Sequence, residues 1–371
     1  MRKFFATLSL LSIALAACSS SGDNEPIKIG LISALTGDAA AIGADQLSGV
    51  QWAVEQINAA GGINGRQVVL VAEDGKCTGA DAATAAQKLV NVDKVTVIVG
   101  GLCSGETLAA APIVEAGKVV LLSPSSSSPD VTDAGTFVFR DYPSDAWKTK
   151  AMAKYFQDSD LKKVAIISEN TDYAQALRAS LKKDLPADAV VFDEVVEPGT
   201  KDFRSLFTRL KDIDFDVFVP NPNGDGTNGV MVQQFREQGF TQQITGQDTM
   251  DSATVAQIAG EAAEGVTLVN VPTAGEGTSY ETDFKAKFGD PKSSIAWSAY
   301  AYDAANVLIA AMKSVGTDGD AIRNYLNTMQ PYAGVIGTFS FDQNGDPVGV
   351  SYVLKKFEAG KIVTVRPLPL E

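Results

Sequence analysis

Cys18 is the residue whose surroundings most directly indicate a chemical modification. It follows Leu15-Ala16-Ala17 and closes a short apolar run that opens with Arg2 and Lys3. A basic start, an apolar middle too short to span a bilayer and small residues before a cleavage point are typical of an export signal. We expect residues 1–17 to be removed as a lipoprotein signal peptide, so that Cys18 becomes the N-terminus and carries a lipid on its thiol. An ordinary cleaved signal with an incidental cysteine is the alternative.

The residues after Cys18 have the composition of a linker rather than of a folded segment. Ser19 to Pro26 contain serine, glycine, asparagine and acidic residues, and we expect 18–26 to form a flexible, solvated tether. The folded part then begins near Ile27. These features predict a protein outside the cytoplasm, in the periplasm or at the cell surface, that is held to a membrane by its lipid.

Two further cysteines, Cys77 and Cys103, form an even pair once Cys18 is lipidated. In an oxidising compartment such a pair is expected to form a disulfide. The loop-entropy model assigns a bridge across about 26 residues roughly 3 to 4 kcal/mol of stabilisation, which makes it a structural link. Two separate buried thiols are the alternative.

The composition disfavours several classes of function. The chain has no histidine, which removes Ser-His-Asp and Cys-His catalysis and the common zinc sites, although catalysis by carboxylates or lysine stays formally open. Without Arg2 and Lys3 there are 29 basic residues against 45 acidic ones, a formal charge of about −16, which disfavours nucleic-acid binding. We therefore expect no enzyme, no cofactor and no metal site.

Strands and helices alternate along the first part of the chain. Apolar runs at 28–34, 67–73, 95–100 and 119–122 predict strands, and segments with helical spacing at about 47–57, 80–92 and up to 116 lie between them. Strict alternation predicts a parallel sheet, and the nearly continuous apolar strands predict helices on both of its faces. The first lobe is therefore expected to be doubly wound.

The same pattern restarts near Ser144 and predicts a second lobe. Strands are expected at 163–168, 189–195, 216–219 and 265–269, with helices at about 144–157, 173–185, 203–210 and 230–237. Helices at about 297–315 and 321–329 precede a predicted hairpin of 338–341 with 350–357, turned through 342–346. Two similar α/β lobes predict a cleft between them.

Four motifs give the chain a specific resemblance. They are Asn58-Ala59-Ala60-Gly61-Gly62-Ile63-Asn64-Gly65, Gly101-Leu102-Cys103-Ser104, Ser123-Pro124-Ser125-Ser126-Ser127-Ser128-Pro129 and Ile258-Ala259-Gly260-Glu261-Ala262-Ala263-Glu264-Gly265. Together they resemble the substrate-binding proteins of branched-chain amino acid ABC transporters. The resemblance implies a type I periplasmic-binding-protein fold, with two doubly wound α/β lobes joined by a three-crossing hinge. It places lobe 1 at 27–143 and 272–347 and lobe 2 at 144–271 and 348–371.

Ser104 is the candidate site residue with the clearest physical argument. It lies where a strand passes into a helix, and the unpaired N–H groups at a helix start can hold a carboxylate without lysine or arginine. A simple helix N-cap is the alternative. The matching Leu-Cys-Ser context favours contact with a ligand.

The resemblance supplies the other candidate residues. It assigns the backbone carbonyl of Ser125 and the hydroxyl of Ser127 to the ammonium group of an amino acid, Tyr173 to a contact formed on closure, and Asp248 to an ion pair with the ammonium. A plain loop for the serines, core packing for Tyr173 and a solvated surface position for Asp248 are the alternatives.

Three departures from the family pattern concern the ligand pocket. Asp248 stands where a glutamate is usual, Ile42 where a tyrosine is frequent, and 220–224 replace a segment that elsewhere supplies an aromatic wall. The resemblance thus implies a lipid-anchored, monomeric receptor that gives a free amino acid to an ABC permease, with the identity of that amino acid open. A receptor for an amide or urea and a ligand-sensing partner of a signalling protein are the alternatives.

Overall fold

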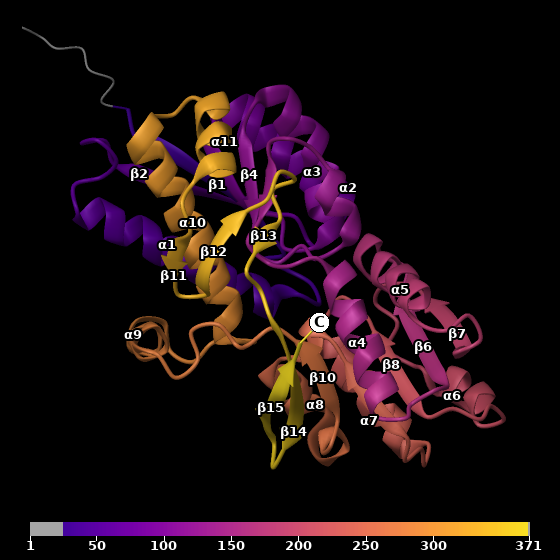
Figure 1. Ribbon diagram of the computed structural model, residues 1–371. Coiled ribbons are helices and arrows are strands. Elements are labelled where there is room, and N and C mark those ends of the chain that lie inside the picture. Colours follow the sequence, from indigo (N-terminus) through magenta and orange to yellow (C-terminus); the bar gives the residue numbers. More distant parts are fainter. Residues whose placement is uncertain (1–24, 370–371) are drawn as a thin grey trace, which may run out of the picture.

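The computed structural model describes residues 25–369, which fold into two α/β lobes lying one against the other (Figure 1). The predicted signal peptide, Cys18 and most of the predicted tether lie outside these residues. None of the helices in 25–369 is both long enough and apolar enough to cross a bilayer.

The first lobe is built on a five-stranded sheet with the order β2-β1-β3-β4-β5, in which all neighbours are parallel. Its strands are β1 (Ile27–Ser33), β2 (Val68–Asp74), β3 (Val97–Gly100), β4 (Val120–Ser123) and β5 (Val138–Arg140). The predicted parallel sheet is therefore confirmed. Since the direction of strand addition reverses between β1 and β3, ligands are expected beyond the carboxyl ends of these two strands.

Helices cover both faces of this sheet because alternate strand residues point to opposite sides. Ile29 and Leu31 pack with α1 and α10, whereas Ile32 and Ile98 pack with α2 and α3. The helices are α1 (Ala40–Ala59), α2 (Gly79–Gln87) with a π-helical continuation η1 (Lys88–Asp93), α3 (Ser104–Gly117), α10 (Ile295–Val315) and α11 (Gly319–Thr328). Helix α9 (Ser279–Phe288), the 3₁₀ turn η2 (Pro129–Asp133) and a small sheet of β11 (Tyr332–Gly334), β12 (Gly337–Phe341) and β13 (Pro347–Val348) complete the lobe.

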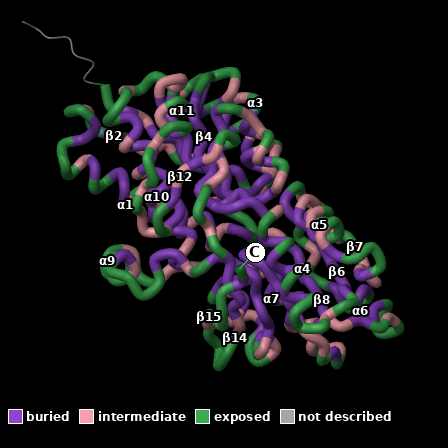
Figure 2. The backbone as a smooth tube through the Cα atoms, viewed as in Figure 1, coloured by how far each residue is buried: buried purple, intermediate pink, exposed green. Residues whose placement is uncertain are grey.

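The second lobe has a seven-stranded sheet with the order β15-β14-β10-β9-β8-β6-β7. Its central strands are parallel and buried, as the purple segments of Figure 2 show, and β14 and β15 extend it in antiparallel fashion. The strands are β6 (Val164–Glu169), β7 (Val190–Val196), β8 (Val217–Asn221), β9 (Gln243–Gly246), β10 (Thr267–Asn270), β14 (Tyr352–Glu358) and β15 (Lys361–Leu368). The helices are α4 (Asp145–Asp158), α5 (Asp172–Asp184), α6 (Arg204–Leu210), α7 (Asp225–Glu237) and α8 (Ala253–Ala259), with 3₁₀ turns η3 (Asp248–Met250) and η4 (Gly260–Ala263).

The chain passes between the two sheets three times, between β5 and α4, after β10, and between β13 and β14. This agrees with the three-crossing hinge that the resemblance implied. The residue numbers at which one lobe gives way to the other stay a prediction.

The predicted hairpin of 338–341 with 350–357 is wrong. Strand β12 pairs with β11 and with the two-residue β13, whereas β14 crosses to the other lobe and pairs with β10 and β15. The turn at 342–346 does join β12 to its true partner. Local periodicity identifies a strand, but the partner is the sheet edge that the strand can cover, and the edge of β10 lies far away in sequence.

Several elements were not predicted because their sequence patterns are weak. Strand β5 has three residues, and β9, α8 and α9 have too few apolar positions for a clear period. Strand β15 is largely exposed, and α7 begins at Asp225, five residues before the predicted start. Of these elements, β9 bears directly on the site, because it leads into the turn η3 that begins at Asp248.

Candidate functional site

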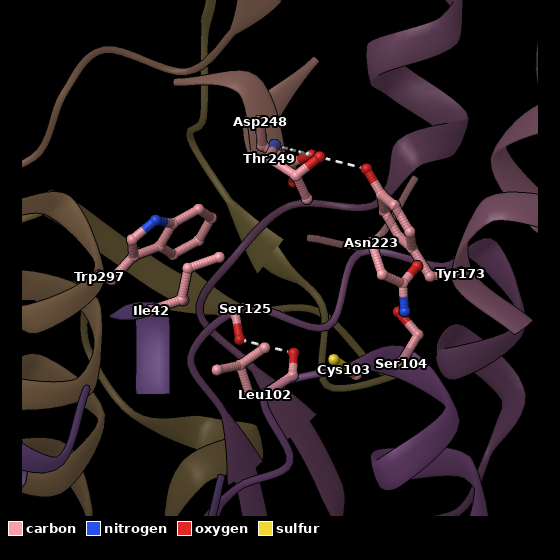
Figure 3. Close-up of a pocket in the computed structure, with 10 residues that line it drawn as sticks. All are labelled: Ile42, Leu102, Cys103, Ser104, Ser125, Tyr173, Asn223, Asp248, Thr249 and Trp297. Carbon is pink, nitrogen blue, oxygen red and sulfur yellow. Dashed lines mark hydrogen bonds between the residues drawn. The ribbon is translucent and has the colours of Figure 1, made fainter. Parts of the chain in front are cut away.

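A hollow between the two lobes is lined by residues of both lobes. The space between its walls, counted together with the solvent at its mouth, is about 350 Å³. Figure 3 shows the ten residues that line it: Ile42, Leu102, Cys103, Ser104, Ser125, Tyr173, Asn223, Asp248, Thr249 and Trp297. The structure thus brings Ser104, Ser125, Tyr173 and Asp248 together around one space.

The start of α3 forms one wall of this hollow. Helix α3 begins at Ser104, directly after the switch-point strand β3, and Cys103 is its N-cap residue. The N–H groups of the first helical turn have no acceptors within the helix, and the helix dipole adds positive potential there. The hydroxyl of Ser104 accepts a hydrogen bond from the Ser128 N–H at 3.1 Å, so its own proton is free to be donated. This wall can bind a carboxylate.

The serine loop after β4 contributes less directly. The Ser125 hydroxyl lines the hollow but is engaged, since it donates to the Leu102 carbonyl at 2.7 Å and accepts from the Gln46 amide at 2.8 Å. The hydroxyl of Ser127 donates to Asp145 at 3.0 Å, and Ser127 is not among the lining residues. The roles assigned to these serines therefore stay predictions.

Tyr173 and Asp248 form the opposite wall, from the second lobe. Tyr173 lies in the first turn of α5 and is 5% exposed, and its hydroxyl donates to an Asp248 oxygen at 2.7 Å (Figure 3). Asp248 is 2% exposed, so it is not a solvated surface residue. An acidic group thus lies across the hollow from the start of α3.

Lys148 is a charged residue that sequence reasoning missed. Its ammonium lies 2.6 Å from one oxygen of Asp145 and 2.9 Å from the second oxygen of Asp248, and its side chain is fully buried. Burial disfavours the charged ammonium, but the two carboxylates raise the pKa of Lys148 above its usual value. A sequence signal existed, because Lys148 falls on the same helical face as the buried Met152 and Tyr155.

The third wall is apolar. Three apolar side chains lie on the side of the hollow away from Tyr173 (Figure 3): Ile42 of α1, Leu102 just before α3, and Trp297 of α10. The sequence identified Ile42 and the segment 220–224, which contains Asn223, as positions of the ligand pocket, whereas Trp297, Leu102 and Thr249 were not proposed. Trp297 has the sequence pattern of an ordinary core residue in a long apolar helix. It lies in the first turn of α10 and lines the hollow.

The predicted disulfide is present and borders the site. Cys77 and Cys103 are bridged with their Cα atoms 5.2 Å apart. The Glu106 carboxylate accepts hydrogen bonds from the N–H groups of both cysteines, each at 2.9 Å, and burial raises its pKa to about 7. The bridge therefore ties the β2–α2 loop to the start of α3.

The lobes touch on either side of the hollow. The Asp38 carboxylate accepts a hydrogen bond from the Lys201 ammonium at 2.9 Å. It accepts another at 2.7 Å from the hydroxyl of Thr227, which lies at the start of α7. Gly224 permits this approach, because a Cβ there would lie 2.0 Å from an Asp38 oxygen. Ser293 donates to Asp225 at 3.0 Å across the other side. These contacts describe a closed arrangement.

The arrangement suits a molecule with separate charged and apolar parts. An anionic group fits the start of α3, a cationic or donor group fits Asp248, and an apolar group fits Ile42 and Trp297. Within residues 25–369, no group of three His, Cys, Asp or Glu side chains is placed to hold a metal ion.

Comparisons with known proteins agree with this geometry. The family model described as periplasmic binding protein matches residues 26–361. The Leu/Ile/Val-binding protein BraC3 of Rhizobium johnstonii is 31% identical over 91% of this chain and 93% of its own length, and the Leu/Ile/Val-binding protein of Citrobacter freundii is 30% identical over 95% and 92%.

Solved structures are similar over almost the whole described chain. The leucine binding protein LivK of Thermotoga maritima has a TM-score of 0.85 at 26% identity and covers 92% of this chain and 98% of its own. The branched-chain amino acid transporter substrate binding protein LivJ of Streptococcus pneumoniae, solved in complex with isoleucine, has a TM-score of 0.82 at 30% identity and covers 92% and 100%.

Proposed function

Because this chain belongs to the periplasmic binding protein family, we propose that it captures a free amino acid, of the branched-chain type or a related one, between its lobes. It delivers the closed complex to an ABC permease and performs no chemistry on the ligand. The named binding preferences of BraC3 and the isoleucine complex of LivJ support this choice of ligand.

One observation carries the proposal: the start of α3 at Ser104 faces Asp248 across a hollow with an apolar wall. In an α-amino acid the carboxylate, the ammonium and the side chain are all attached to one carbon. The carboxylate binds the N–H groups at Ser104, the ammonium binds Asp248, and the side chain packs on Ile42 and Trp297. Since Asp248 and Ser104 come from different lobes, a bound zwitterion stabilises the closed arrangement.

Family membership implies a location outside the cytoplasm, and the anchor is part of the proposal. The Leu15-Ala16-Ala17-Cys18 sequence supports a lipid on Cys18 that holds a monomeric receptor at a membrane surface.

A receptor for a neutral amide or urea is the second candidate. The ion pair of Asp248 with Lys148, taken by itself, favours it, because a carboxylate that already has a cationic partner can accept hydrogen bonds from an uncharged donor. The second carboxylate on Lys148, that of Asp145, counts against it, because it leaves the group one positive charge short.

A thermal-shift panel separates the two candidates. The twenty amino acids, their amides and urea are each added to the protein, and a ligand at one hundred times its Kd is expected to add about 2.7 kcal/mol to the free energy of unfolding. A shift with amino acids and none with amides supports the proposal. A shift with amides alone, or none at all, contradicts it.

The contact of Asp38 with the start of α7 is expected to slow ligand release. Asp38→Ala removes the acceptor of Lys201 and Thr227, so we expect about a threefold to tenfold weaker affinity, mostly through faster dissociation. Stopped-flow dissociation measures it. Lys154→Ala, which breaks an exposed ion pair within α4, is the control. An unchanged dissociation rate in Asp38→Ala would show that this contact does not hold the lobes closed.

A further inference from the structure

Three buried charged side chains meet directly behind the Asp248 wall of the hollow. Asp145 and Lys148 lie one turn apart at the start of α4, and Asp248 opens the turn η3. The side chains of Asp145 and Lys148 are 0% exposed and that of Asp248 is 3% exposed. Lys148 and Asp145 do not line the hollow, whereas Asp248 does.

The charges in this cluster do not balance. Two carboxylates share one ammonium, which leaves one negative charge without a partner in a place shielded from water. The phenols of Tyr142, Tyr173 and Tyr352 surround the cluster, and burial raises the pKa of each well above 10, so they stay neutral. The nearby Arg140 is committed to Asp346 at 2.6 Å.

An isolated buried charge is costly, and a buried pair that lacks one partner is strongly destabilised. Asp248 lines the hollow, so a further cation can reach it from there, and its other contacts are Tyr173, Lys148 and the Thr249 N–H. A ligand ammonium placed against Asp248 would bring the cluster to two positive and two negative charges, so that the charges balance.

We propose that Lys148 is a positioning and specificity-determining residue, which leaves the Asp145–Lys148–Asp248 cluster one positive charge short so that the ammonium of an amino acid completes it. This inference deepens the proposed function and rests on it. Lys148 does not touch the ligand. It sets the charge that the ligand must bring, while the Tyr173 hydroxyl and the Thr249 N–H also hold Asp248 in place. The cluster thereby favours an ammonium over the neutral end of an amide.

Changing the charge balance and then restoring it tests the inference. Asp145→Asn leaves one carboxylate and one ammonium, so the cluster is neutral, and we expect at least tenfold weaker binding although Asp145 is outside the ligand wall. The double variant Asp145→Asn with Lys148→Gln returns the charge to minus one through Asp248 alone. Its affinity is expected to recover to within about threefold of the wild type. Calorimetry measures the Kd of each variant, and the ligand is the amino acid that gives the largest shift in the thermal-shift panel.

If Asp145 and Lys148 only stabilise the fold, a second substitution is expected to weaken ligand binding further. If the double variant binds as weakly as Asp145→Asn or more weakly, the charge-balance inference is wrong. Lys150→Gln is the matched control, because Lys150 lies exposed on the same helix and the change removes the same charge. If the wild type binds no amino acid, the proposed function has failed, and this result is distinct from any pattern among the variants.

The pH dependence of binding gives a second measurement. Burial raises the pKa of Asp145 to about 6, and Lys148 opposes that rise. A cationic ligand favours the ionised carboxylates, so affinity in the wild type is expected to fall as the pH drops below about 6. Without Lys148 the Asp145 carboxylate holds its proton to higher pH, and the fall in Lys148→Gln is expected to begin at least one pH unit higher. Identical profiles for this variant, Lys150→Gln and the wild type would overturn the inference.

Discussion

Asp248→Asn is expected to weaken amino-acid binding about 100-fold or more. The change removes the only carboxylate of the cluster that lines the hollow and leaves Lys148 paired with Asp145 alone. Loss of one partner from a buried, hydrogen-bonded charge pair costs about 2 to 5 kcal/mol, which is roughly 30-fold to 5,000-fold in Kd. Calorimetry with the selected amino acid measures the effect.

Two comparisons make the Asp248 result specific. Asp214→Asn is the matched control, because its side chain is 85% exposed on the same lobe. A ligand with the same side chain and no ammonium should lose much less affinity to the Asp248 change than the amino acid does. Equal losses for both ligands would show that Asp248 holds the pocket together and does not recognise the ammonium.

Removing the disulfide is expected to cost about 3 to 4 kcal/mol of unfolding free energy. The double variant Cys77→Ser with Cys103→Ser opens a loop of 26 residues, and the loop-entropy model assigns it a cost of that size. Urea unfolding gives the difference between the wild type and the variant.

The same variant also tests whether the bridge supports the site. Cys103 lines the hollow beside Ser104, and the Asn223 amide of the other lobe lies 3.3 Å from the Cys77 sulfur. We therefore expect weaker ligand binding in addition to lower stability. A reducing agent should reproduce both effects in the wild type and change nothing in the double variant. A wild type whose unfolding is insensitive to reduction would contradict the prediction.

Much of the architecture is readable from local patterns. Apolar runs between helical segments predicted most of the strands of both sheets, and the strand-to-helix junction at Ser104 predicted an anion site where the structure has one wall of the hollow. The cysteine count predicted the bridge. Each of these features depends on residues close together in the chain or on the pairing of two cysteines, and such signals can be recognised in the sequence alone.

The partners of these elements are not readable in the same way. Strand β14 has a clear strand pattern, yet the hairpin predicted for it was wrong, because β14 belongs with its partner β10 to the second lobe, whereas β12 belongs to the first. Trp297 has the pattern of a core residue, and its exposure to the hollow follows from the position of α10 against α1.

The sequence by itself determined the alternation of strands and helices and the helix start at Ser104, because short-range sterics and periodic burial leave few other structures for these segments. It determined the disulfide pair because Cys77 and Cys103 are the two cysteines other than Cys18. Only the tertiary structure decided that Lys148 meets Asp248, one hundred residues further along the chain. A buried charge is tolerated only beside its partner, and packing between distant elements selects that partner.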